Sequence, residues 1–298
     1  MDIVDGDTLL APGAALERVA TGSEWAEGPC WVPGRDRLRW SDVAGDRILE
    51  FDPATGATSV YAERTEFVNG RTLDRDGSVL QCSHGRRRIE RDRDGVVEPV
   101  VDRYGSLLFN SPNDLVVDSL GAIWFSDPPY GLHESGREGH PGRPEYGGCY
   151  VFRVDPVTGD ADAVITDMVH PNGLAFSPDE SVLYVADTGY LWDDRAPGWI
   201  RAYDVVDGRC IHPRVFAEVR PGSADGFRVD EAGRVWSSSR DAVRVYSPEG
   251  EPLLVVPVPE TVSNVAFGGP DGSDLYITAT TSLYRIRTTT RAASRPAR

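Results

Sequence analysis

Six short segments of this sequence place an oxygen-bearing side chain just before an apolar run. They contain Glu27 in AEGPCW, Asn69 in FVNG, Asn113 in SPND, Asn172 in HPNG, Asp225 in SADG and Asn264 in VSNV. One such residue is explained by turn capping, but six of six call for a common partner, because crowded polar groups must be satisfied. Carboxylate and amide oxygens are ligands for hard cations, and carboxylates also accept protons. These six residues, called the polar ring below, therefore predict a cation site able to support hydrolysis.

A second set of residues follows the polar ring at a nearly constant interval. It comprises Asp42, His84, Asp127, Asp187, Ser239 and Ala279. Asp225 and Glu27 are the first candidates for the catalytic base, and Asp127 or His84 could act from this second layer. A buried histidine that only orients Asn69 is an equally good interpretation of His84.

The donor types narrow the choice of metal. Calcium takes about six to eight oxygen ligands and accepts amide and carboxylate oxygens together, so one calcium ion is the expected cofactor. Zinc prefers His or Cys, and His84 is the one such residue in these two sets. Magnesium, manganese and zinc stay open as alternatives. The chain has no lysine and no Gly-x-Ser-x-Gly elbow, so attack by metal-activated water is favoured over a covalent acyl-enzyme.

The elements that must position these residues are short strands. Apolar runs alternate with turns such as DRDG, DPATG and SPEGE, which is typical of an antiparallel all-β protein. Six repeats of strand, turn and strand, most followed by a second pair, predict a six-bladed β-propeller with four antiparallel strands per blade. Equivalent residues then meet at one mouth of the central channel. The N-terminal run AALERVAT is expected to supply the missing outer strand and close a single domain over residues 1–298.

Two intervals between polar ring positions exceed the about 40–45 residues of a propeller blade, so they contain insertions. These insertions, at about 128–148 and 188–198, follow strands that end at the mouth and are expected to act as lids. Tyr130 and Trp192 are the expected substrate-stacking residues. These loops also contain three more side chains with aromatic rings that could stack on a sugar, His133, Tyr146 and Tyr190.

Composition excludes several classes of partner. A net charge of −16 and a pI of about 4.7 argue against nucleic acid, which requires a basic surface. No stretch approaches the about 20 apolar residues of a membrane span, and the first residues show no signal peptide, so a cytoplasmic location is expected. The sequence leaves the oligomeric state open.

Four segments resemble the gluconolactonase and regucalcin family, which is also called senescence-marker-protein and luciferin-regenerating-enzyme-like. They read EGPCW, SPNDLVVDSLGAIWFSDPPYGL, HPNGLAFSPDES and ADGFRVDEAGRVW, and the resemblance covers about Glu24 to Arg287. It implies a six-bladed propeller with one divalent metal and hydrolysis of a small sugar lactone. It also implies Glu27, Asn172 and Asp225 as metal ligands, and Asn113 as a ligand or a substrate contact.

Departures from the family pattern place the chain nearest the bacterial gluconolactonases. Ser111 stands where the regucalcin branch has arginine, and Arg71 where an apolar residue is usual. Asn113 and Asn69 are therefore the expected substrate-binding amides. Two alternatives stay open, a phosphotriesterase-like hydrolase on the same site and a non-catalytic calcium-bound binding module. A strictosidine-synthase-like propeller is disfavoured, because the acidic ring would have no role there.

Overall fold

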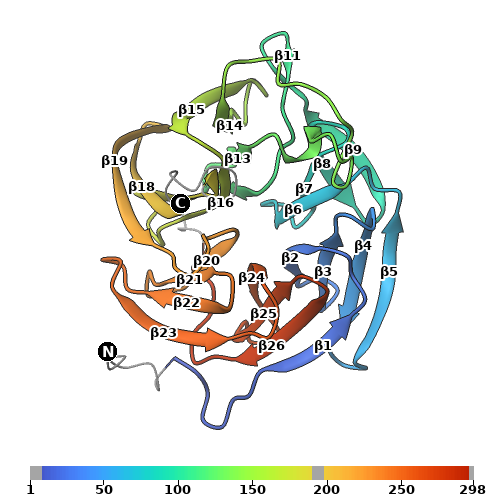
Figure 1. Ribbon diagram of the computed structural model, residues 1–298, viewed down its shortest axis with the longest axis vertical. Helices are drawn as coiled ribbons and strands as arrows, with labels where there is room; N and C mark the ends of the chain where they lie inside the picture. Colours follow the sequence, from blue (N-terminus) through green and yellow to red (C-terminus); the bar gives the residue numbers. More distant parts are fainter. Residues whose placement is uncertain (1–8, 190–197, 295–298) are drawn as a thin grey trace.

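The computed structural model describes residues 9–189 and 198–294, which form six four-stranded antiparallel sheets around a central axis (Figure 1). The first three sheets contain β2 (Ala26–Val32), β3 (Arg37–Asp42), β4 (Arg47–Asp52) and β5 (Ala57–Glu63); β6 (Val68–Leu73), β7 (Val79–Ser83), β8 (Arg88–Arg93) and β9 (Val96–Val101); and β12 (Leu115–Val117), β13 (Ile123–Asp127), β14 (Cys149–Val154) and β15 (Ala161–Met168). The other three contain β16 (Pro171–Phe176), β17 (Val182–Asp187), β18 (Trp199–Val206) and β19 (Arg209–Glu218); β20 (Phe227–Val229), β21 (Val235–Ser238), β22 (Ala242–Tyr246) and β23 (Pro252–Pro257); and β24 (Val262–Gly268), β25 (Asp274–Ala279), β26 (Ser282–Arg287) and β1 (Glu17–Thr21). A small hairpin, β10 (Arg103–Tyr104) with β11 (Leu107–Leu108), and the 3-10 turn η2 (Tyr130–Leu132) lie in the connections. The predicted six-bladed propeller is confirmed.

The ring is closed by the N-terminal strand, as the strand count predicted. β1 pairs antiparallel with β26, with Glu17 opposite Arg285 and Thr21 opposite Ser282. The last blade thus takes three strands from one end of the chain and one from the other. Full closure covers the strand edges that an open sheet would expose.

The inner strands approach one another so closely that only glycine fits after four of the six polar ring residues. The Gly70 N–H donates to the Asn113 carbonyl oxygen at 2.8 Å, and the Gly173 N–H donates to the Asp225 carbonyl oxygen at 2.9 Å. A Cβ atom on Gly173 would lie 2.3 Å from that Asp225 oxygen. The Asn172-Gly173 pair at the start of β16 therefore makes a contact between blades and is not a hairpin turn.

Large aromatic residues fill the space between neighbouring blades. Trp40 and Tyr276 are buried together between the first and last blades, and the rings of Trp236 and Phe267 pack edge to face at 5.6 Å between the last two. Burial of large side chains between the blades holds the sheets in a rigid ring around the channel.

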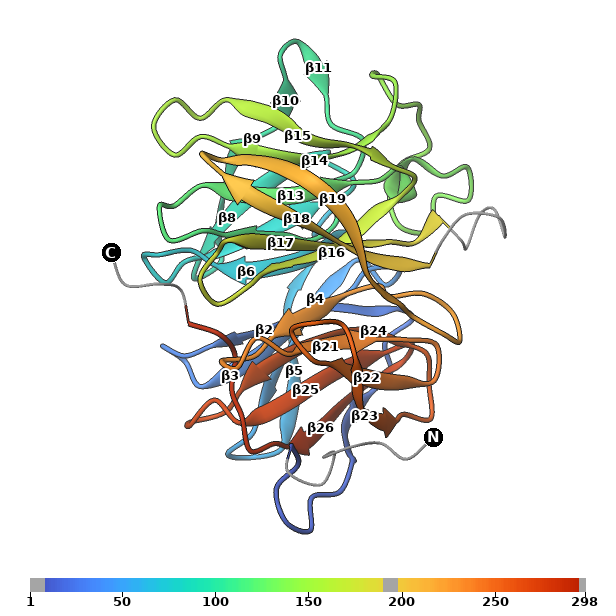
Figure 2. The same cartoon turned by 90° about the vertical axis from the view of Figure 1, so that its left-hand side faces the viewer.

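The two faces of the ring differ in what they carry. Figure 2 shows the loop that follows β13 projecting from one face, while the last described residues lie at the other. The loop starts where β13 ends, and β13 ends beside the start of the inner strand β12. The polar ring side chains therefore lie at the face that bears this loop. Within the described part of the chain, no helix has the length and apolar character needed to cross a bilayer.

Candidate functional site

The polar ring residues occupy equivalent places at the start of the inner strands. Five are almost fully buried, and Asp225 is half-buried. The register of four inner strands shifts at this point, for example between Glu27 and Cys30 in β2 and between Pro171 and Leu174 in β16. Such irregularities turn the first side chain of each strand toward the channel, because a bulge changes the direction in which a residue points.

Three amides of the ring form a directed hydrogen-bonded chain. The Asn69 Nδ2 donates to Asn113 Oδ1 at 2.5 Å, and the Asn113 Nδ2 donates to Asn172 Oδ1 at 2.6 Å. Hydrogen bonding between the side chains of Asn172 and Asp225 continues the chain to a carboxylate. Each amide orients the next, so the chain holds four blades in register at the mouth.

Glu27 and Asp225 come from the first and fifth blades, and their side chains hydrogen-bond with each other at the mouth. Burial raises the pKa of Asp225 to about 7, with further contributions from the negative charges of Glu138 and Asp114. Burial, followed by the charge of Asp225, raises the pKa of Glu27 well above its usual range. Within the described residues, neither carboxylate forms an ion pair with an arginine or histidine. One buried and one half-buried carboxylate with no cationic partner among the described residues are unfavourable side by side, so the pair favours binding of a cation.

The donor set fits a hard cation. Glu27 and Asp225 supply carboxylate oxygens, and Asn113 and Asn172 supply amide oxygens beside them. In the segments 9–189 and 198–294, no three side chains of the types His, Cys, Asp and Glu converge as metal ligands. An all-oxygen set of two acids and two amides is suited to calcium and poorly suited to zinc.

His84 lies behind the ring in the position of an orienting residue. It is 1% exposed, and burial lowers its pKa to about 4, so the imidazole of His84 is neutral at physiological pH. Its Nδ1 donates to the Glu138 carbonyl oxygen at 2.9 Å, which leaves Nε2 to accept from Asn69 Nδ2 at 3.4 Å. These contacts favour the orienting interpretation. A role for His84 in proton transfer stays a prediction.

Asp127 lies deeper than the sequence indicated. It is fully buried, and its Oδ2 accepts hydrogen bonds from the Asn110 backbone N–H at 2.7 Å and from the Tyr146 hydroxyl. Asp42 and Asp187 likewise accept backbone N–H groups from the segment that precedes their inner strand. The repeated contact favours a structural role, in which each aspartate fixes the approach to the mouth.

Exchange of Asp127 for asparagine is expected to preserve the fold and turnover while changing the pH dependence of stability. Burial raises the pKa of Asp127 to about 7 from an ordinary 3.8, so the folded state holds a proton that the unfolded state has released between these values. Wild-type stability relative to Asp127→Asn should therefore fall as pH rises from about 4 to 7. Urea unfolding of both proteins at several pH values measures this difference. A loss of turnover above about 100-fold with normal folding would instead support proton transfer by Asp127.

The aromatic residues of the two loops lie in different surroundings. Tyr130, in η2, lies near Asp225 and Asn172 and hydrogen-bonds with the Thr188 hydroxyl. Tyr146 stacks on Tyr150 at 5.2 Å in the third blade, and its hydroxyl donates to Asp127. Trp192 and Tyr190 lie outside the described residues. Whether the two loops cover a substrate stays a prediction.

Two carboxylates at the site were missed in the sequence. Asp114 follows Asn113 directly and accepts from Asn264 Nδ2 at 3.3 Å, with Arg228 Nη1 at 3.5 Å. Its place beside a ring residue was a usable signal. Glu138 lies in the loop after β13 and acts electrostatically on Glu27 and Asp225. No repeat or spacing marks it, so only the path of the loop reveals it.

Both the sequence and the fold of this chain are similar to those of proteins named as lactonases. Residues 25–281 match the family model described as SMP-30/Gluconolactonase/LRE-like region. A gluconolactonase of Zymomonas mobilis is 32% identical and aligns with 95% of this chain and 84% of its own. A pentonolactonase of Haloferax volcanii is also 32% identical, over 87% of this chain and 83% of its own. The solved structure of a gluconolactonase from Xanthomonas campestris superposes with a TM-score of 0.90 at 37% identity, covering 97% of this chain and 93% of that one.

Proposed function

Because the chain belongs to the SMP-30/gluconolactonase/LRE-like family, we propose that it is a hydrolase that opens a sugar lactone at the mouth of its channel. The observation that carries the proposal is the pair of carboxylates, Glu27 and Asp225, meeting at the end of an amide chain. Relatives named as lactonases along nearly the whole chain make a lactone the expected substrate.

Glu27, Asn172 and Asp225 are proposed to hold one divalent cation, with Asn113 as a fourth ligand or a substrate contact. Calcium is the cation that best suits these oxygens. When bound, such an ion polarises the lactone carbonyl and stabilises negative charge on its oxygen.

The chain's own residues then have three tasks. Asn69 and Asn113 present amide groups that can bind the hydroxyls of a sugar, and Tyr130 supplies an aromatic wall beside them. His84 holds Asn69 in place through its Nε2. A carboxylate oxygen of Asp225 or Glu27 accepts the proton of the attacking water, because a neutral imidazole with a pKa of about 4 is a poor base at neutral pH.

The decisive experiment is hydrolysis of a panel of aldonolactones, followed by acid release, with and without a chelator. We expect turnover of at least one sugar lactone, its loss after chelation, and its return when calcium is added. Phosphotriesters and simple aryl esters serve as comparison substrates.

Each of the other outcomes would indicate a different function for this protein. Turnover of phosphotriesters without lactones would indicate the phosphotriesterase-like alternative. Calcium binding without turnover of any substrate would indicate a binding module. Full lactonase activity in a chelated protein shown to be metal-free would contradict the proposed role of the cation.

A further inference from the structure

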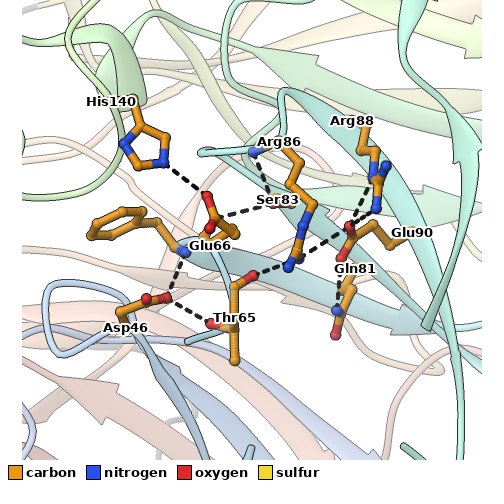
Figure 3. Close-up of polar contacts among 10 residues, drawn as sticks. Asp46, Thr65, Glu66, Gln81, Ser83, Arg86, Arg88, Glu90 and His140 are labelled. Carbon is orange, nitrogen blue, oxygen red and sulfur yellow. Dashed lines mark hydrogen bonds and ion pairs between the residues drawn. The ribbon is translucent and has the colours of Figure 1, made fainter. Parts of the chain in front are cut away.

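The loop at residues 128–148 is held over the channel mouth by contacts with the second blade. The Glu138 carbonyl oxygen accepts from His84, whose other nitrogen contacts the ring residue Asn69. Two residues later, His140 Nε2 lies 2.8 Å from Glu66 Oε2, a contact that Figure 3 shows beside β7. The backbone of Glu138 is thus tied to the site through one buried side chain.

The loop also packs against itself. A Cβ atom on Gly139 would lie 2.2 Å from the Gly131 carbonyl oxygen, so the outgoing and returning arms touch without room for a side chain. At its far end, Glu145 accepts the Leu108 N–H at 3.0 Å and pairs with Arg87 at 3.2 Å. Anchors on both sides of Glu138 give its side chain a defined place.

The carboxylate of Glu138 lies near the mouth, because its backbone carbonyl oxygen contacts the buried His84 behind the ring. It is half-buried and acts electrostatically on Glu27 and Asp225, which come from the first and fifth blades. Burial raises the pKa of Glu138, while the positive side chains of Arg137 and His133 lower it. Both of these are exposed, and within the described residues Glu138 has no ion-pair partner within 4.0 Å.

The charges that an entering ligand meets are mostly negative. Glu27 and Asp225 belong to the ring, Asp114 follows the ring residue Asn113, and Glu138 in the loop acts on both ring carboxylates. Arg228 Nη1 lies 3.5 Å from Asp114 Oδ2, His84 is neutral, and the sequence contains no lysine. Arg137 is the nearby cation of the loop, and its side chain is exposed. One cation bound by the ring would offset the charges of Glu27 and Asp225 but leave Glu138 uncompensated in the loop near the mouth.

We infer that Glu138 determines substrate specificity by selecting against lactones that carry a negative charge, such as a carboxylate, sulfonate or phosphate on the sugar. This inference rests on the proposed lactonase function and names a substrate class for it, the uncharged polyhydroxylated lactones. A like charge in a partly desolvated mouth raises the free energy of the bound anionic substrate, while a neutral hydroxyl is free to donate to the carboxylate.

The test compares two substrates that differ only at C6, glucono-1,4-lactone and the anionic glucaro-1,4-lactone. We expect wild type to prefer the neutral lactone in kcat/KM, and Glu138→Gln to reduce that preference on the order of tenfold, or about 1.4 kcal/mol. Added salt should reduce the wild-type preference and have a smaller effect on Glu138→Gln. Glu134→Gln, an exposed glutamate of the same loop, is the matched control and should keep the wild-type ratio.

An unchanged ratio in Glu138→Gln, with both lactones turned over, would overturn the role of Glu138 and leave the proposed function standing. Absence of turnover of any lactone would instead refute the proposed function. In that case calorimetric binding of the corresponding neutral and anionic lactams decides on Glu138 alone. Equal relative affinities in wild type and Glu138→Gln would then overturn it.

Discussion

Replacement of Asp225 by alanine is expected to weaken calcium binding by about 100-fold or more and to remove lactonase turnover with it. Mutation of a residue that only hydrogen-bonds to a metal ligand typically reduces metal affinity or activity by about 10–100-fold. Asp225 is itself a proposed ligand, and one of only two that carry a charge. Calorimetric titration of the metal-free protein with calcium measures the affinity. At 100 times its dissociation constant, calcium should stabilise wild type by about 2.7 kcal/mol, and this increment should vanish in the variant.

Two further variants make this result specific. Asp225→Asn keeps the shape but removes the charge, so the metal-free variant should unfold at a higher temperature than metal-free wild type, because burial and repulsion from Glu27 no longer act on a carboxylate. Asp162→Ala, on the exposed edge of β15, removes an equal charge far from the mouth and should bind calcium like wild type. Unchanged calcium content in Asp225→Ala would show that the ligand assignment is wrong.

Substitution of Gly173 by alanine is expected to be among the most destabilising single changes in this chain. The new Cβ would lie 2.3 Å from the Asp225 carbonyl oxygen and 2.7 Å from the Gly226 Cα, both of them backbone atoms that cannot rotate away. Relief requires the inner strands of two blades to separate, which also stretches the 2.9 Å hydrogen bond between them. Overpacking of this kind costs typically about 1–3 kcal/mol and sometimes more. The midpoint of urea unfolding measures the loss.

The effect should extend to the site, because Asn172 and Asp225 adjoin the two strands that are pushed apart. Calcium affinity of the folded variant is therefore expected to fall as well. Gly147→Ala is the matched control, since a Cβ there meets no atom within 4 Å. Equal stability of the two variants would show that the inner strands do not approach each other closely at Gly173.

Much of the fold could be predicted because its information is local and repeated. Alternation of apolar residues marks each strand, Asp-Gly and Pro-Glu-Gly turns mark the hairpins, and six repetitions leave a closed ring as the simplest way to cover the strand edges. The polar ring could be predicted for the same reason. Equivalent positions such as Asn69 and Asn172 must reach equivalent places around the axis, whatever the details of packing.

The sequence did not reveal how deep each polar side chain lies. Asp127 was expected in a second catalytic layer, yet the structure buries it among the Asn110 N–H and the Tyr146 hydroxyl. Tyr146 comes from a loop that was expected to act as a lid, yet its side chain packs on Tyr150 in the third blade. Burial and direction depend on neighbours that are distant in sequence, and no local pattern encodes them.

The sequence by itself therefore determined the six blades, their closure by the N-terminal strand, and the residue types gathered at one mouth of the channel. Only the tertiary structure decided that Glu27 and Asp225 meet without a cationic partner in the described part of the chain, and that the loop brings Glu138 near them. The strands follow a short-range period that the residues themselves carry. The loop path depends on contacts such as His84 with Glu138 and Glu66 with His140, which join residues 54 and 74 positions apart and form only when the blades are assembled.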